Sequence, residues 1–162
     1  MKSKRKTLDE KADIRVILHN IRSAHNVGSI FRTSDARGVK HIYISGYTPA
    51  PIDKFQRQRK EISKTALGGQ FSVSWSKENI FKIVEKLKKE GFKIYSIEQS
   101  EDSISYRDLK KEEKMVFILG NEVRGLSKDI LSKSDVVVEI EMAGQKESLN
   151  VSVAFGIVAF SI

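Results

Sequence analysis

Short apolar runs, rich in β-branched and aromatic residues, recur along the chain and are separated by polar stretches. Six of these runs have the length and composition of β-strands, at residues 14–18, 41–45, 71–75, 93–97, 115–119 and 136–140. Helical patterns lie between several of them, which is typical of strands joined by crossover helices. The chain is therefore predicted to be an α/β protein, with a mostly parallel sheet flanked by helices.

Two amphipathic helices are predicted between these strands. The clearer one covers about residues 76–90, with Ser76 as its N-cap and Gly91 as a left-handed residue after its end. Its apolar residues follow the i, i+3, i+4, i+7 spacing, at Ile80, Ile83, Val84 and Leu87. The other helix is expected at about residues 27–37, where Gly38 ends it.

The last predicted helix, from about Asn150, is apolar on nearly every side. Its apolar residues are Val151, Val153, Ala154, Phe155, Ile157, Val158 and Phe160. A helix with so little polar surface lies either deep in the core or against another subunit.

Length and composition limit the class of protein. The 162 residues are 40% hydrophobic, enough for a single domain covering residues 1–162 with a short basic tail at about residues 1–12. Cysteine is absent and there are three histidines, which excludes disulfides and thiolate metal sites. No apolar run approaches the roughly 18 residues of a membrane span. We expect a metal-free cytoplasmic protein.

The positive charge is concentrated in the first part of the chain. The net charge is +8, and residues 1–60 hold 14 Lys and Arg against 5 Asp and Glu, whereas the remainder is nearly balanced. Two basic clusters stand out: Lys2, Lys4, Arg5 and Lys6, and then Lys54, Arg57, Arg59 and Lys60. They favour contact with RNA phosphates, although a solvated tail and a solvated helical turn would look the same.

A glycine-containing segment, residues 120–127, follows a buried strand and precedes a helix. It has two glycines at P-loop spacing, but Leu126 stands where a P-loop needs lysine, so nucleoside triphosphate hydrolysis has no support. The segment can still hold a ligand through its main chain, or it can simply be a tight turn. Glu122 is less ordinary, because the carboxyl ends of parallel strands face the crevice where such sheets bind ligands.

Polar residues also begin two of the predicted helices. Ser148 and Asn150 can cap the last helix, or their surroundings can bind a polar ligand or a phosphate. Near the first helix, Arg32 can pair with Asp35 on the surface or grip an RNA phosphate with its guanidinium.

Three segments together resemble the SpoU/TrmH-type RNA 2′-O-ribose methyltransferases of the SPOUT superfamily. Residues 26–32, 117–125 and 140–154 are similar to the first, second and third motifs of that family, and the resemblance covers about residues 14–160. The third motif usually reads Ile-Pro-Met, whereas this chain has Glu141 in place of the proline. This substitution frees a backbone N–H and adds a charge beside the expected cofactor loop.

The resemblance implies a C-terminal deep trefoil knot, a homodimer and S-adenosylmethionine as cofactor. By the same resemblance, the cofactor-binding residues are Leu119, Gly120, Asn121, Gly125, Ile140, Met142, Ser148 and Leu149. The catalytic residues are Arg32, Asn26, Glu122, Ser148 and Asn150, with Arg32 assisting deprotonation of the ribose or positioning the reacting groups, and Glu122 bracing the second loop.

The expected activity is methylation of a ribose 2′-hydroxyl in RNA, with tRNA favoured over ribosomal RNA. The alternatives are the same reaction on ribosomal RNA, or a non-catalytic dimeric RNA-binding protein with the same fold. Val153 and Phe155 are expected at the dimer interface.

Overall fold

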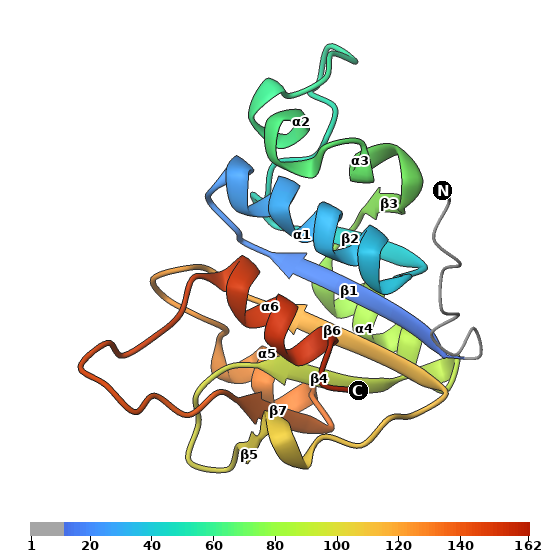
Figure 1. The fold of residues 1–162 in the computed structure, drawn as a ribbon. Coiled ribbons are helices and arrows are strands. Elements are labelled where there is room, and N and C mark those ends of the chain that lie inside the picture. The colour runs from blue at the N-terminus through green and yellow to red at the C-terminus, as the bar shows by residue number, and fades with distance from the viewer. Residues whose placement is uncertain (1–11) are drawn as a thin grey trace, which may run out of the picture.

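The computed structural model describes residues 12–162 and contains one parallel sheet in that range (Figure 1). Its strands are β1 Asp13–His19, β2 His41–Ser45, β3 Ser74–Lys77, β4 Lys93–Ile97, β5 Ile104–Ser105, β6 Lys114–Leu119 and β7 Val136–Glu139. The helices are α1 Ala24–Arg37, α2 Lys60–Ala66, α3 Gly69–Ser72, α4 Ile80–Lys89, η1 Tyr106–Asp108, α5 Lys128–Lys133 and α6 Val151–Ala159. The strand order is β3-β2-β1-β6-β4-β7-β5, and each neighbouring pair runs parallel.

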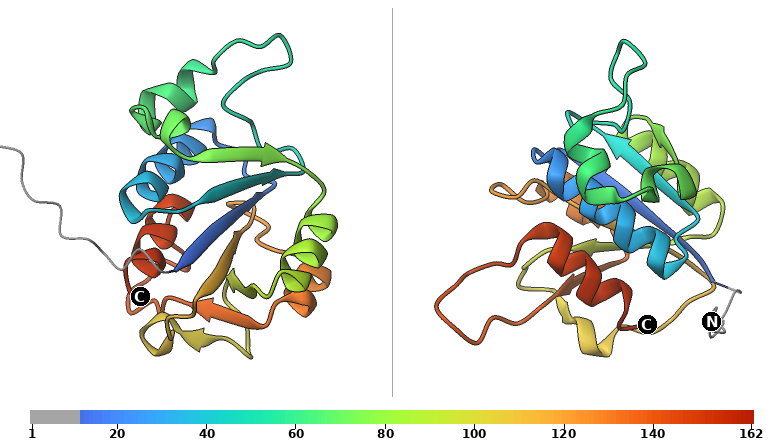
Figure 2. Two further views of the ribbon diagram at one scale, coloured as in Figure 1. Left: turned by 90° about the vertical axis from the view of Figure 1, so that its right-hand side faces the viewer. Right: turned by 45° about the horizontal axis from the view of Figure 1, so that its top comes forward.

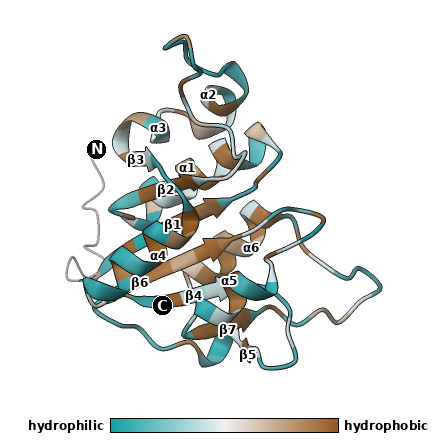
Figure 3. Cartoon of the chain, turned by 180° about the vertical axis from the view of Figure 1, so that it is seen from behind, coloured by the Kyte–Doolittle hydropathy of each residue, from teal (hydrophilic) through white to brown (hydrophobic). Residues whose placement is uncertain are grey.

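Helices cover both faces of the sheet, as Figure 2 shows. Alternate residues of β1 serve the two faces: Val16 and Leu18 pack in a core with α1 and α6, whereas Ile17 packs in a core with α4 and α5. Strands buried on both faces read as continuous apolar runs, which is why the sequence pattern identified them. In Figure 3 the central strands are accordingly coloured as hydrophobic.

Five of the six predicted strands are confirmed with ends that shift by at most one residue, and the third is wrong in part. Phe71 belongs to the short helix α3 and is 70% exposed, and β3 begins only at Ser74. Gly68, at φ 93°, lets the chain turn into that helix, which an apolar pattern cannot reveal.

Both amphipathic helices are confirmed, but their first residues differ from the prediction. Asn79, not Ser76, caps α4, because its Oδ1 accepts hydrogen bonds from the N–H groups of Phe81 and Lys82. Ser76 lies in β3, where its hydroxyl contacts His41. Helix α1 begins one turn earlier than predicted, with Ser23 as its cap, so Asn26 is already helical.

Helix α6 is partly in the core and partly exposed. Phe155, Val158 and Ala159 are buried, whereas Val153 and Phe160 are 50% and 52% exposed. The assignment of Phe155 to a dimer interface is therefore wrong, because its side chain lies wholly inside the chain's own core. Val153 remains available for such a contact.

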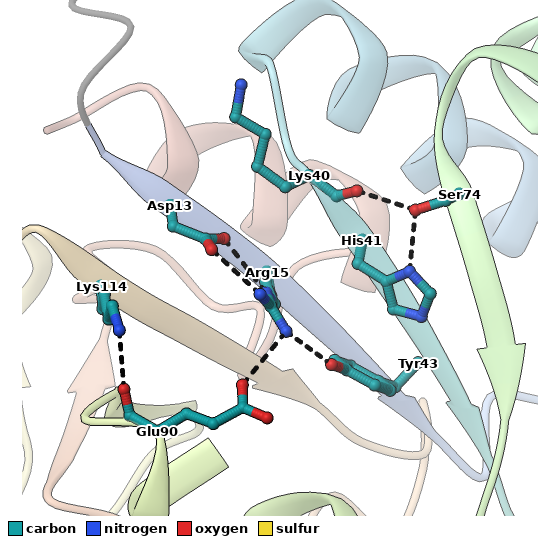
Figure 4. Close-up of polar contacts among 8 residues, drawn as sticks. All are labelled: Asp13, Arg15, Lys40, His41, Tyr43, Ser74, Glu90 and Lys114. Atoms are coloured by element: carbon teal, nitrogen blue, oxygen red, sulfur yellow. Dashed lines mark hydrogen bonds and ion pairs between the residues drawn. The ribbon is translucent and has the colours of Figure 1, made fainter. Parts of the chain in front are cut away.

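A polar network holds the amino-terminal ends of β1 and β2 (Figure 4). Arg15 donates hydrogen bonds to both carboxylate oxygens of Asp13 and to the hydroxyl of Tyr43, and it lies 3.6 Å from Glu90. Its guanidinium also stacks over Phe92, 4.5 Å from the ring centroid. This network is at the opposite end of the strands from the cavity described below.

The expected basic tail lies almost wholly outside the described residues, together with Lys2, Lys4, Arg5 and Lys6. Within residues 12–162, every helix is too short or too polar to cross a lipid bilayer.

Candidate functional site

The loops after three adjacent strands, β6, β4 and β7, enclose a cavity of about 300 Å³ together with the start of α6. The residues lining it are Ile97, Glu98, Gln99, Leu119, Gly120, Asn121, Glu122, Val123, Gly125, Val138, Glu139, Ile140, Met142, Glu147, Ser148, Leu149, Val151 and Ala154. The eight residues expected to bind the cofactor are all among them. The cavity lies at the carboxyl ends of parallel strands, where open α/β sheets bind their ligands.

Asn121 fixes the shape of the loop after β6. Its side-chain carbonyl accepts hydrogen bonds from the N–H groups of Val123 and Arg124, at 2.9 and 2.8 Å. Its amide donates to the carbonyl of Asn20 and to the hydroxyl of Tyr47, at 3.0 and 2.9 Å. The buried side chain of Asn121 therefore has both donors and its acceptor satisfied, and it braces the loop.

Gly125 closes the same loop in a left-handed conformation that other residues rarely adopt. Its φ is +65°, and a Cβ atom there would lie 2.2 Å from Oε2 of Glu98. That oxygen accepts a hydrogen bond of 3.0 Å from the N–H of Leu126. Glu98 thus supports the loop from the end of β4.

The sequence prediction missed Glu98, although the information to find it was present. Glu98 directly follows a predicted strand, in the same position relative to β4 as the residues at the end of β6. Gln99, the next residue, was missed as well. Its amide donates to the carbonyl of Glu147 at 2.7 Å and so holds the loop after β7 against the end of β4.

Glu122 braces the start of α1 from the loop after β6. Its carboxylate accepts hydrogen bonds from the N–H groups of Arg22 and Ser23, at 2.9 and 3.1 Å, and from the side chain of Asn26, at 3.2 Å. Burial of the carboxylate raises its pKa, but these hydrogen bonds outweigh the burial, and the pKa of Glu122 lies below its ordinary value. The carboxylate is therefore ionised at neutral pH.

Asn150 connects this group to α6. Its amide donates to Oδ1 of Asn26 at 3.0 Å, while its own Oδ1 caps the helix by accepting from the N–H of Ser152 at 2.9 Å. Asn26, Glu122 and Asn150 thus form one hydrogen-bonded chain at the edge of the cavity, and Ser148 lines the cavity itself.

Arg32 is not part of this cavity within a single chain. It is exposed and lines a separate hollow, together with Lys64 and Leu67 from the α2 region and Phe160 from the end of α6. Arg32 follows Asn26 by six residues, about 9 Å along the axis of α1. The structure therefore places Glu122 and Ser148 in the lining of the cavity, joins Asn26 and Asn150 to Glu122 at its edge, and leaves Arg32 on an outer face.

Glu141, the residue that replaces the usual proline, faces away from the cavity. A hydrogen bond from the side chain of Ser105 is the main reason that its pKa is lowered, and the charge of Arg107 contributes to the same shift. Ile140 and Met142 on either side still line the cavity. The added charge thus lies beside β5 and η1.

The charge around the cavity suits a cationic ligand better than a polyphosphate. Four glutamates line it, at positions 98, 122, 139 and 147, and no Lys or Arg occurs among its described lining residues. Phosphate groups are stabilised by cationic side chains, which the described lining does not contain, whereas carboxylates stabilise a positive centre.

This fold and site define the class of SpoU/TrmH-type RNA 2′-O-methyltransferases. Residues 13–160 match the SpoU rRNA Methylase family, and the chain belongs to that family.

Relatives of known function share most of this chain. A tRNA (guanosine(18)-2′-O)-methyltransferase of Aquifex aeolicus is 32% identical over 99% of this chain and 74% of its own length. The 23S rRNA (guanosine(2553)-2′-O)-methyltransferase RlmP of Bacillus subtilis is 28% identical, over 91% of this chain and 56% of its own length. This chain thus spans little more than half of the second relative.

Solved structures have the same fold. The AdoMet-bound rRNA methyltransferase of Sinorhizobium meliloti superposes with a TM-score of 0.83 at 27% identity, covering 94% of this chain and 56% of that one. The TrmH/SpoU tRNA modifying enzyme of A. aeolicus gives a TM-score of 0.80 at 29% identity, covering 93% of this chain and 75% of that one.

Proposed function

We propose that this protein transfers a methyl group from S-adenosylmethionine to a ribose 2′-hydroxyl of RNA. The observation that carries the proposal is the cavity at the ends of β4, β6 and β7. Its described lining residues include four glutamates and no Lys or Arg. The chain of hydrogen bonds through Asn26, Glu122 and Asn150 joins the three family motifs at its edge.

The residues of the cavity fit this cofactor. S-adenosylmethionine supplies a methyl group that is activated by its bond to a positively charged sulfur. Ile97, Leu119, Ile140 and Leu149 provide apolar walls, and the loops after β6 and β7 provide main-chain donors and acceptors. A volume of about 300 Å³ is at the lower end of the range of ligand cavities, about 300–1,000 Å³.

The chain's own polar groups would position the ribose. Ser148 lines the cavity, and Asn26 and Asn150 are hydrogen-bonded to each other at its edge. These side chains would orient the sugar and its phosphate, with Asn26 fixed in turn by Glu122. Placing an oxygen nucleophile close to the methyl carbon and in line with the departing sulfur supplies much of the rate enhancement in such a transfer.

Arg32 would complete the site across a homodimer. A guanidinium keeps its proton in proteins, so we assign Arg32 to hold the phosphate and stabilise the developing charge, and not to remove the proton itself. The hollow that Arg32 lines is bordered by Phe160, which is half exposed. Val153, on α6, exposes further apolar surface. Pairing of this face between two chains would bury that surface and bring each Arg32 to the other chain's cavity.

The proposal extends to the path of the chain after β6. Strand β4 lies between β6 and β7 in the sheet, so the chain after β6 passes to the far side of β4 before it reaches α6. We propose that this segment is threaded as a deep trefoil knot. Such threading is rare in proteins.

Transfer RNA is the proposed substrate, with ribosomal RNA as the alternative. The named relatives include enzymes for each. Incubating the protein with labelled S-adenosylmethionine and unmodified tRNA or ribosomal RNA tests both. Methylation of the 2′-oxygen blocks cleavage by base, so the label should appear at an alkali-resistant linkage.

A second experiment separates the enzyme from a non-catalytic RNA-binding protein. Calorimetry with S-adenosylmethionine should show binding in the first case. RNA binding without cofactor binding would favour the second and contradict the proposed reaction.

A further inference from the structure

The loop between β2 and α2 carries an exposed phenyl ring beside two cations. Phe55 is 64% exposed, and the ammonium of Lys54 and the guanidinium of Arg57 lie 5.0 and 4.9 Å from its ring centroid. The loop projects from the rest of the chain, at the top of Figure 1. The ring contributes nothing to the core and is free to contact a ligand, together with the two cations beside it.

The tip of this loop has a defined conformation. Oδ1 of Asp53 accepts hydrogen bonds from the N–H groups of Phe55 and Arg57, at 2.8 and 3.0 Å, and Oδ2 accepts from Nε of Arg57 at 3.0 Å. Ile52 and Gln58 pair across the base of the loop as an antiparallel bridge. The phenyl ring is therefore held ready for binding, which reduces the entropy lost when a ligand binds.

Helix α2, which follows this loop, packs closely on α1, the helix that carries Arg32. A Cβ atom at Gly28 would lie 2.0 Å from Oγ1 of Thr65, so glycine is needed for this approach, and that hydroxyl donates to the carbonyl of His25 at 2.8 Å. Lys64, on the same helix, lines the hollow that contains Arg32. Basic side chains thus extend from Arg32 along α2 toward the loop.

We propose that Phe55 is a stacking platform for an unpaired base of the RNA substrate, with Lys54 and Arg57 contacting the phosphates beside that base. This inference rests on the proposed methylation of RNA, and it specifies that the substrate presents a single-stranded or looped segment apart from the reacting ribose. Aromatic side chains stack on bases that are splayed out of a helix, whereas a duplex hides the faces of its bases.

The two cations differ in a way that fits this role. The ion pair with Asp53 keeps Arg57 next to the ring. Within residues 12–162, Lys54 has no hydrogen bond or ion pair, so its ammonium can leave the ring for a phosphate when a base arrives. The only carboxylate of the tip, Asp53, is occupied by Arg57, which leaves the surface positive for RNA.

The test is binding of the full chain to an RNA hairpin whose unpaired loop carries 2-aminopurine, compared with a duplex of equal length. Phe55→Ala should weaken hairpin binding by about 5- to 100-fold and abolish the quenching of 2-aminopurine, because one base loses its stacking partner. Duplex binding should stay unchanged. Phe55→Trp, which keeps an aromatic ring at this position, should retain both the affinity and the quenching.

Two controls separate stacking from charge. Phe81 is 42% exposed with Lys133 5.8 Å from its ring, but it lies on α4 at the other face of the sheet, so Phe81→Ala should leave hairpin binding intact. Lys54→Gln should lower the slope of log K against log salt by about one, whereas Phe55→Ala should leave that slope unchanged.

Three outcomes are decisive. If Phe55→Ala binds the hairpin as the wild type does while the wild type still methylates RNA, the stacking platform is refuted and the proposed function stands. If Phe55→Ala changes the oligomeric state in sedimentation, the ring belongs to an interface between copies and the inference is wrong. If the wild type quenches 2-aminopurine but methylates no RNA, stacking is supported and the proposed function fails.

Discussion

The side-chain amide of Asn150 donates a hydrogen bond to the side chain of Asn26 across a sequence separation of 124 residues. Asn26 in turn donates to Glu122, so the starts of α1 and α6 and the loop after β6 are joined by side chains alone. Each of these three residues comes from a different sequence motif. Their contact is what turns three separate segments into a single site.

Replacing Asn150 should affect stability and activity separately. Asn150→Ala removes the helix cap of α6 and should lower the free energy of unfolding by about 1 kcal/mol. Asn150→Ser retains a capping oxygen but lacks the amide that reaches Asn26, so it should recover most of the stability while methyl transfer stays reduced. Denaturant unfolding and initial rates measure the two effects. Equal activity of Asn150→Ser and the wild type would show that the contact with Asn26 is not needed.

Glu122 should make stability depend on pH in the acidic range. Its folded-state pKa lies below the ordinary value of 4.5, so its stabilising effect is complete above about pH 4.5 and is lost as the pH falls through the folded-state pKa. Glu122→Gln should cost about 1 kcal/mol at pH 7, a modest value because the carboxylate is partly exposed to solvent. The difference between wild type and variant, measured by denaturant unfolding, should shrink below pH 4.5. A difference that stays constant down to pH 3 would contradict this origin of the pKa.

Gly125→Ala should damage the cofactor cavity. The new Cβ atom would lie 2.2 Å from Oε2 of Glu98, so this carboxylate, which accepts from the N–H of Leu126, must move, and a side chain at a φ of +65° adds strain of about 1–3 kcal/mol. Calorimetry should show weaker binding of S-adenosylmethionine. Gly91→Ala is the matched control, because φ is +85° there but no atom lies within 4 Å of the Cβ position. Gly91→Ala should lower stability and leave cofactor binding unchanged; if both variants bind equally well, the loop is not the cofactor site.

Arg32 should act on the cavity of the other subunit. Arg32→Ala should abolish methyl transfer but keep cofactor binding. Gly125→Ala should weaken cofactor binding but keep Arg32 in place. Subunits of the two variants, mixed under conditions that allow exchange, should regain about a quarter of the wild-type rate, because half of the dimers are mixed and each has one complete site. A mixture as inactive as its components would place Arg32 in the cavity of its own chain or outside the reaction.

The strands and the cavity could be predicted from sequence because both depend on local pattern. The strand at residues 93–97 is a run buried on both faces, and the structure has it as β4 with the same bounds. The resemblance to the family identified Gly120 and Ile140 as candidate cofactor residues, and both line the cavity, since parallel strands bring their carboxyl ends to one edge. Phe71 was misplaced because an apolar residue in a short helix looks the same in sequence as one in a strand.

The sequence by itself therefore determined the α/β class, most of the element positions, the family and eight of the residues that line the cavity. Only the tertiary structure decided which side chains meet: Glu122 with the start of α1, Asn26 with Asn150, and Arg32 with the hollow beside α2. Periodicity records which face of an element is buried, but not the order of strands in the sheet or the packing of helices across it. Those contacts depend on β4 lying between β6 and β7 and on the close approach of α2 to α1, which are properties of the folded chain.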